Sequence, residues 1–204
     1  MQKQNFTFEI IVVDDGSTDK TFEITNRYDL VKPIRLEKNS GKGAAVREGM
    51  LNASGEYVIF SDADLSTPIE EIPKLMKYLT SGIDVCVGSR ALDSSLIKLH
   101  QPFYREFMGK TFNKIVQLLV VKGISDTQCG FKGFTQSAVK KIFPNQKING
   151  FGFDVEIIYI AKKNGLKIIE TPVVWYNDNR SKVDPIKDSV KMLMEIIEIR
   201  SLHK

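Results

Sequence analysis

The chain has 204 residues, 42% of them hydrophobic and 26% charged, which is the composition of a globular protein with one ordinary domain. The net charge of +4 comes without any block of lysine and arginine, so it argues against a nucleic-acid partner and suits an anionic substrate or an anionic membrane surface. No apolar run approaches the roughly 20 residues that span a bilayer. We expect no signal peptide, and the spacing of Cys86 and Cys129 fits neither a metal site nor a disulfide framework, so we expect a cytoplasmic protein.

The first half of the chain alternates predicted strands and helices. Its strands are continuous apolar runs, which is typical of strands that are covered by helices on both faces. The predicted strands are residues 9–14, 33–37, 57–61 and 84–89, and the predicted helices are residues 18–28, 42–51 and 68–79. This alternation predicts a doubly wound α/β fold with a mostly parallel sheet.

The second half is less regular, and we expect it to complete a single domain that covers residues 1–204. Its predicted elements are helices at 103–121, 154–164 and 185–200, an extended glycine-containing stretch at 126–134, a strand at 168–175 and a polar loop at 177–184. The last helix has apolar residues on two faces. Such a helix either lies in a groove of its own domain or contacts something further, for example a membrane surface or a partner.

Acidic residues follow two of the predicted strands. Asp62 and Asp64 come directly after the strand at 57–61, and Asp14 and Asp15 end the strand at 9–14. Hard cations such as Mg²⁺ prefer carboxylate oxygens and often share them with substrate phosphates, although an acidic pair also occurs in solvated turns and helix caps. Ligands of open α/β sheets bind beyond the carboxyl ends of the strands. The pattern therefore predicts a site for a divalent cation and a nucleotide diphosphate.

Basic residues in two further turns suit the same ligand. Lys42 lies in a glycine turn that opens a helix, but the spacing fits neither a Walker motif nor a dinucleotide fingerprint. Arg90 follows the strand at 84–89 and is either a salt-bridge partner or an anion clamp. Asp154 and Glu156 lie at a helix start, where negative charge also stabilises the helix dipole.

Several of these segments together resemble a known family. Residues 12–17 (VVDDGS), 39–43 (NSGKG), 62–64 (DAD), 88–90 (GSR) and 126–132 (DTQCGFK) occur in the same order in family-2 glycosyltransferases. The resemblance is greatest to the polyprenyl-phosphate glycosyltransferases of the dolichyl-phosphate β-glucosyltransferase type, and it extends over nearly the whole chain. It implies a nucleotide-sugar-binding fold of the glycosyltransferase A type, with a donor half at about 1–90 and an acceptor half at about 91–204.

The resemblance also implies an activity and a set of site residues. It implies inverting transfer of a hexose onto a polyprenyl phosphate, with Mg²⁺ or Mn²⁺ held by Asp62 and Asp64. Because Ser66-Thr67 stand where mannosyl relatives carry Gln-His, the donor is expected to be UDP-glucose rather than GDP-mannose. The implied catalytic residues are Asp64, Arg90, Arg105, Gln128 and Lys132, and the implied substrate-binding residues are Asp14, Asp15, Gly16, Lys42, Asp62, Asp154 and Lys182.

One departure from the family pattern concerns the beginning of the chain. Family members begin with an additional strand and helix before the first acidic motif, and that strand lies centrally in the sheet, so the sequence reads as lacking its first strand. Two alternatives to the lipid-phosphate acceptor remain open. One is a sugar hydroxyl acceptor, which needs a carboxylate base such as Asp154 or Glu156; the other is an inactive nucleotide-sugar-binding domain. With a lipid acceptor, we expect a peripheral protein at the cytoplasmic face of a membrane.

Overall fold

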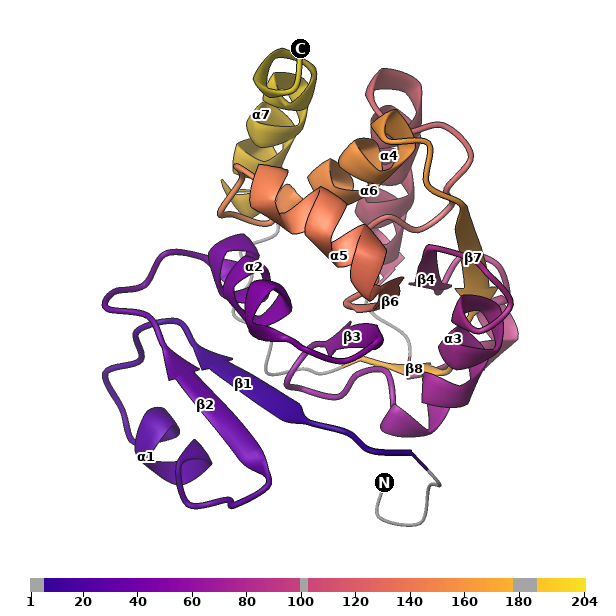
Figure 1. Ribbon diagram of the computed structural model, residues 1–204. Helices are drawn as coiled ribbons and strands as arrows, with labels where there is room; N and C mark the ends of the chain where they lie inside the picture. Colours follow the sequence, from indigo (N-terminus) through magenta and orange to yellow (C-terminus); the bar gives the residue numbers. More distant parts are fainter. Residues whose placement is uncertain (1–5, 100–102, 178–186) are drawn as a thin grey trace.

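The computed structural model of the chain describes residues 6–99, 103–177 and 187–204. In this part of the chain the strands form three sheets, and helices cover both faces of the largest one (Figure 1). Within the same residues no helix combines the length and the apolar character that crossing a bilayer requires.

The secondary structure follows the chain as an alternation of strands and helices. The strands are β1 (Ile10–Asp14), β2 (Val31–Arg35), β3 (Tyr57–Ser61), β4 (Val85–Ser89), β5 (Ile97–Leu99), β6 (Phe131–Thr135), β7 (Ile168–Pro172) and β8 (Trp175–Tyr176). The α-helices are α1 (Thr21–Thr25), α2 (Lys42–Asn52), α3 (Ile72–Leu79), α4 (Phe103–Leu119), α5 (Gln136–Ile142), α6 (Phe153–Lys163) and α7 (Lys187–Leu202). Short 3₁₀ turns are η1 (Ile69–Glu71), η2 (Ser94–Leu96) and η3 (Phe143–Asn145).

The largest sheet has the strand order β3-β6-β4-β7 and separates two apolar cores. β6 runs antiparallel to both of its neighbours, whereas β4 and β7 are parallel. On one face, Cys86 and Phe131 pack against Leu75 and Leu79 of α3. On the other face, the larger core joins the sheet to α4, α5, α6 and α7. The sheet is thus buried on both faces, as its continuous apolar strands predict.

β1 and β2 form a separate parallel sheet. Helix α2 contacts both β1 and β3, and so connects the small sheet to the large one. Within the described residues β1 pairs only with β2 and β3 pairs only with β6, so each of these two strands has one edge without a strand partner. Within the described residues, no strand-to-strand ladder joins this pair to the sheet of four strands.

Most predicted elements agree with the structure to within two or three residues, and the exceptions have local causes. The helix predicted at 18–28 is reduced to α1, which has no buried residue to stabilise a longer helix. The strand predicted at 168–175 divides into β7 and β8. Helix α5 was not predicted, although Thr135 caps it by accepting a hydrogen bond from Ala138 N at 3.2 Å. Most of the polar loop predicted at 177–184 lies outside the described residues.

The open edges predict that the 204-residue chain self-associates. Leu36 N donates to Asp14 O at 2.9 Å, so the main-chain groups of Asp14 face β2. Main-chain groups alternate sides along a strand, so the main-chain groups of Val12 also face β2 and those of Ile11 face the open edge. We expect Ile11→Pro to reduce association, since it removes a donor from the open edge, and Val12→Pro to lower the melting temperature, since it breaks the ladder.

Light scattering during size exclusion, together with thermal melts, would check this pair of variants. A wild-type chain that stays monomeric at high concentration with one sharp transition would contradict the prediction.

Candidate functional site

Charged side chains from four segments come together at one end of the large sheet. Asp62 follows β3, Lys42 opens α2, Lys132 lies in β6 and Asp154 lies in the first turn of α6. They form two ion pairs, Lys42 Nζ with Asp62 Oδ1 at 2.7 Å and Lys132 Nζ with Asp154 Oδ1. The structure therefore brings together four of the residues that the sequence predicts for the site.

The position of Asp62 depends on the absence of a side chain at residue 130. Asp62 N donates to Gly130 O at 2.9 Å, and a Cβ atom on Gly130 would collide with the Asp62 carboxylate. This close approach directs the carboxylate to Lys42. Burial alone would lower the pKa of the Lys42 ammonium, but the negative charges of Asp154 and Asp62 outweigh this effect and raise it. Lys42 is thus a fixed cation at the site.

Asp64 lies in an exposed turn beyond Asp62. Its Oδ1 accepts a hydrogen bond from Ser66 N at 2.9 Å, and Leu65 N donates to Asp62 O at 3.1 Å. Leu65 adopts a φ of +52°, which is uncommon for a residue with a branched side chain. The strained turn presents the Asp64 carboxylate to solvent at the end of β3.

The described part of the chain offers a metal ion at this turn no complete set of side-chain ligands. Within the described residues, no three His, Cys, Asp or Glu side chains lie close enough together to hold an ion. The oxygens of Asp62 and Asp64 are nevertheless of the hard type that Mg²⁺ and Mn²⁺ take, and Mg²⁺ sites commonly combine one or two carboxylates with phosphate oxygens. The residues present therefore fit a cation that is shared with a bound diphosphate.

The Lys132 and Asp154 pair lies in the interior. Lys132 is fully buried; its Nζ also donates to Cys129 O at 2.6 Å and lies 5.2 Å from the centre of the Phe60 ring. Burial raises the pKa of the Asp154 carboxyl, and the positive charge of Lys132 opposes this only in part. The resemblance implies a catalytic role for Lys132; in the structure its ammonium group lies against the Asp154 carboxyl and positions it.

Arg90 forms a two-pronged ion pair with Asp126. Its Nε and Nη2 donate to the two carboxylate oxygens at 2.7 and 2.9 Å, and its main-chain N donates to Asp126 Oδ2 at 2.9 Å. The guanidinium also lies 5.5 Å from the Trp175 ring centre. Of the two roles proposed from the sequence, the geometry is that of a salt-bridge partner. It fastens the end of β4 to the 126–132 segment.

The first acidic motif organises the loop before α2. Asp15 accepts hydrogen bonds from Ser40 N at 2.7 Å and Gly41 N at 2.8 Å. Asp14 accepts one from Ser17 N at 3.1 Å and lies 3.4 Å from Arg35 Nε. Gly16, at a φ of +68°, approaches the main chain at Lys38 too closely for any Cβ atom. These residues hold the turn that carries Lys42.

The amide groups at the start of α2 already have a partner. Asn149 O accepts hydrogen bonds from Gly43 N at 2.8 Å and from Ala44 N at 3.3 Å. This differs from a phosphate loop, in which such amides face the ligand. In this turn it is the Lys42 side chain that reaches the site.

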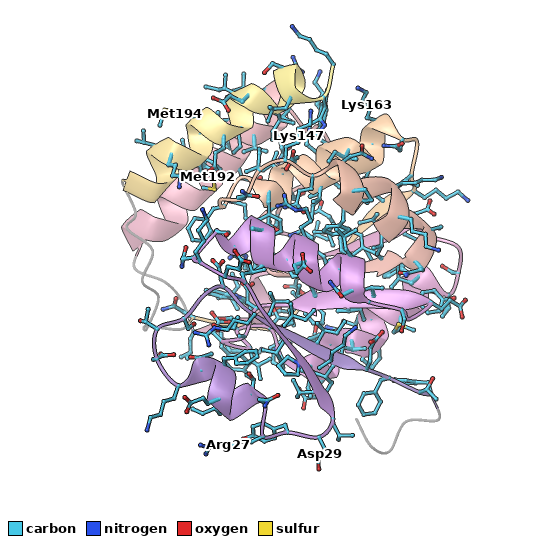
Figure 2. The ribbon with its side chains drawn as sticks, turned by 60° about the vertical axis from the view of Figure 1, so that its left-hand side comes forward. Arg27, Asp29, Lys147, Lys163, Met192 and Met194 are labelled. Carbon is cyan, nitrogen blue, oxygen red and sulfur yellow. The ribbon has the colours of Figure 1, made fainter. Side chains whose placement is uncertain are left out.

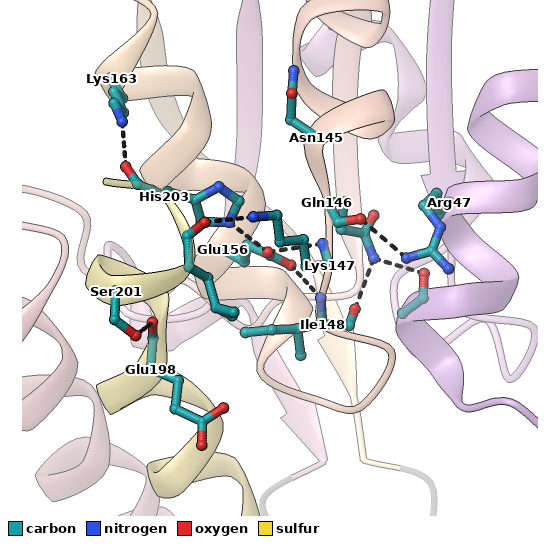
Figure 3. Close-up of polar contacts among 12 residues, drawn as sticks. Arg47, Asn145, Gln146, Lys147, Ile148, Glu156, Lys163, Glu198, Ser201 and His203 are labelled. Carbon is teal, nitrogen blue, oxygen red and sulfur yellow. Dashed lines mark hydrogen bonds and ion pairs between the residues drawn. The ribbon is translucent and has the colours of Figure 1, made fainter.

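The segment that supplies Asn149 is held by residues that the sequence did not assign to this task. Glu156 is fully buried and accepts hydrogen bonds from Lys147 N and Ile148 N, both at 2.9 Å, and lies 2.6 Å from His203 Nε2 (Figure 3). With both of its oxygens occupied in this way, Glu156 is placed as a structural group, which leaves Asp154 as the candidate base. The only signal in the sequence is an acidic residue in the first turn of a helix.

Gln128 is the one remaining predicted site residue whose side chain the structure describes. Gln128 donates from its main-chain N to Asp126 Oδ1 at 3.3 Å and from Nε2 to Met192 Sδ at 2.8 Å, so it joins the site to α7. The side chain of Arg105 and the whole of Lys182 lie outside the described residues, and their roles stay predictions.

Comparison with known proteins identifies the family. The pattern of Glycosyl transferase family 2 matches residues 2–143, which is more than half of the chain. The chain belongs to this family. A dolichyl-phosphate β-glucosyltransferase of Dictyostelium discoideum is 38% identical over 96% of this chain and 63% of its own length, and the human one is 36% identical over 96% and 64%. The chain thus spans about three fifths of the length of these curated relatives.

Solved structures of glycosyltransferases share the fold of this family member. Mannosyl-3-phosphoglycerate synthase from Rubrobacter xylanophilus superposes with a TM-score of 0.72 over 99% of this chain and 66% of that chain, at 17% identity. Glucosyl-3-phosphoglycerate synthase from Mycobacterium tuberculosis, solved with Mn²⁺, UDP-glucose and phosphoglyceric acid, gives 0.68 over 95% and 69%, also at 17% identity. The predicted family and the predicted α/β fold class of the glycosyltransferase A type are both confirmed.

Removing the charge of Asp126 should destabilise the protein. Asp126→Asn leaves the Arg90 guanidinium without its counter-charge, which costs about 3 kcal/mol, the lower part of the range for a broken buried pair, since Arg90 keeps 30% of its side chain exposed. Urea unfolding at neutral pH would measure this. The control Asp29→Asn, at an exposed position, should change stability by less than about 0.5 kcal/mol.

The same pair predicts a dependence on pH. Burial would raise the pKa of Asp126, but Arg90 outweighs burial and lowers it below its ordinary value of 3.8. A lowered pKa means that the pair stabilises the fold fully above pH 3.8 and loses this contribution as the pH falls through the folded-state value. Asp126→Asn should therefore flatten the loss of stability in acid, and an unchanged acid limb would contradict this.

Proposed function

We propose that the protein is an inverting, metal-dependent glucosyltransferase that moves glucose from UDP-glucose to a polyprenyl phosphate of the dolichyl type. The proposal also places it at the cytoplasmic face of a membrane, where such a lipid would be presented. The relatives that support it share the name dolichyl-phosphate β-glucosyltransferase and are 34–38% identical over 96–99% of this chain. The observation that carries it is the group formed by Lys42, Asp62 and Asp64 at the end of β3.

This group has the charges that a nucleotide diphosphate requires. Asp62 and Asp64 would hold the cation, which when bound supplies Lewis-acid stabilisation of the leaving diphosphate. Lys42 keeps its positive charge because of the surrounding carboxylates, and would contribute a second positive group beside Asp62. Asp15 fixes the turn that aims Lys42.

The proposed acceptor explains why no carboxylate has to act as a base. A phosphate monoester is ionised at neutral pH and can attack the anomeric carbon without losing a proton to the enzyme. The enzyme's task is then to bring two anions together, which calls for cations such as the predicted Arg105 and Lys182.

A hydroxyl acceptor is the second candidate, and one observation favours it. Burial raises the pKa of Asp154, and a carboxyl with a raised pKa at the head of a helix beside the site suits general-base catalysis. Asp154 also lies beside Lys132, which would stabilise the ionised form. The identity of the acceptor therefore decides between the two candidates.

The metal site is tested by a single substitution. Asp64→Asn should lower UDP-glucose turnover by on the order of a thousandfold, since the cation's contribution is several kcal/mol and each tenfold in rate is about 1.4 kcal/mol. Chelation by EDTA should have the same effect, reversed by adding Mg²⁺ or Mn²⁺. Asp29→Asn serves as the matched control with unchanged rate. Turnover that persists in EDTA would refute the metal dependence.

The acceptor is tested by offering labelled UDP-glucose together with either a short polyprenyl phosphate or soluble sugars. We expect label on the lipid phosphate alone. We also expect Asp154→Asn to retain transfer per folded molecule, with the folded fraction measured by circular dichroism. This correction for folding is needed because the change leaves Lys132 buried beside a neutral partner. Transfer to sugar hydroxyls alone, abolished by Asp154→Asn in a folded protein, would establish the second candidate.

A further inference from the structure

Helix α7 presents a row of apolar side chains to solvent. Val190, Met194 and Ile197 are 53%, 55% and 61% exposed, and their spacing of four and three residues places them on one face. The opposite face is packed inside, where Ile196 and Ile199 are fully buried. Figure 2 shows Met194 at the outer side of the helix. The core accounts for one of the two apolar faces that the sequence shows, and among the described residues the other face has no partner.

From this row we infer that the outer face of α7, defined by Val190, Met194 and Ile197, lies on an anionic lipid bilayer with the helix parallel to the membrane surface. The inference rests on the proposed function, since a lipid acceptor requires the site to approach a membrane. It goes further by naming the surface that makes the contact. A helix with one apolar face and basic residues beside it is suited to the boundary between headgroups and acyl chains.

Basic side chains surround the outer face. Lys191, Arg200 and Lys204 are exposed on or just beyond α7. Two further lysines reach its C-terminal end, where Lys147 Nζ donates to Leu202 O at 2.6 Å and Lys163 Nζ donates to His203 O. Such a distribution complements the negative potential of an anionic leaflet.

The described side chains of this helix carry more positive than negative charge. The side chain of Asp188 lies outside the described residues, and between residues 190 and 204 the acidic side chains are Glu195 and Glu198. Glu195 turns inward and accepts a hydrogen bond from Gly152 N at 2.8 Å, so Glu198 is the exposed one. The solvent-facing side of this stretch therefore carries a positive balance.

The inner face of α7 places the site close to the proposed membrane. Glu195 binds the main chain two residues before Asp154, and Met192 contacts Gln128. A helix with its side chains is about 10–12 Å across. A bilayer on the outer face would thus bring lipid headgroups to within about one helix diameter of the site. This proximity favours a bilayer as the occupant of the face.

A second copy of the chain suits this face less well. Three partly exposed side chains on one helix fall far short of the roughly 1,200–2,000 Å² that a stable protein interface buries. The basic residues around the row would also repel their equivalents in a symmetric pair.

Vesicle sedimentation tests the inference without reference to activity. We expect the 204-residue chain to bind phosphatidylcholine vesicles that contain phosphatidylserine more tightly than vesicles of phosphatidylcholine alone. Charging the face with Met194→Glu and Ile197→Glu together should weaken binding at least tenfold, since two apolar contacts are lost and two negative charges are added. The matched control is Ile24→Glu with Leu30→Glu, which charges two exposed apolar residues distant in sequence from α7 and should bind as the wild type does.

The outcomes separate this inference from the proposed function. Equal vesicle binding by the charged-face variant and the wild type overturns the inference. So does a concentration-dependent dimer that the variant abolishes, since that would assign the face to a second copy. Transfer to a water-soluble short-chain polyprenyl phosphate should be the same in both proteins. Absence of that transfer in the wild type would count against the proposed function and leave the vesicle result standing.

Discussion

The arrangement of the site depends on one buried cation, the ammonium group of Lys132. An ammonium group that is removed from water is costly unless it is paired and hydrogen-bonded. Here the compensation comes from three separate segments: the Asp154 carboxylate of α6, the Cys129 carbonyl that precedes β6, and the face of the Phe60 ring in β3. The need to compensate one charge thus fixes the start of α6 against the middle of the sheet.

From this cation the charges alternate outward to the surface. Lys132 faces Asp154, the field of Asp154 acts on Lys42, Lys42 pairs with Asp62, and Asp64 lies beyond it in solvent. The first four charges alternate in sign and sum to zero, and Asp64 adds one negative charge at the solvent end of the series. A ligand that brings two negative phosphates and a divalent cation together would add little net charge to such a series, which is one reason why this arrangement suits a metal-bound diphosphate.

The sequence predicts the elements of this structure better than it predicts their partners. Local signals located β3 and α2 closely, because an apolar run and a glycine turn are contained in a few residues. The pairing of Arg90 with Asp126 spans 36 positions, and the hydrogen bonds from Gly43 and Ala44 to Asn149 join loops more than 100 positions apart. A pattern of residue types names the candidates for a charge pair, but which candidates meet is decided by the packing of the whole chain.

The segment around Asn149 has a consequence for how this protein could change over evolutionary time. Gly43 has no room for a Cβ atom, because the Ile148 carbonyl and the Phe153 side chain lie against it, and Gln146 Nε2 donates to Gly43 O at 2.8 Å. The turn that opens α2 and the 146–149 segment therefore meet with their main-chain atoms in contact. A change in one of these segments would require a matching change in the other, so we expect the two segments to be inherited together.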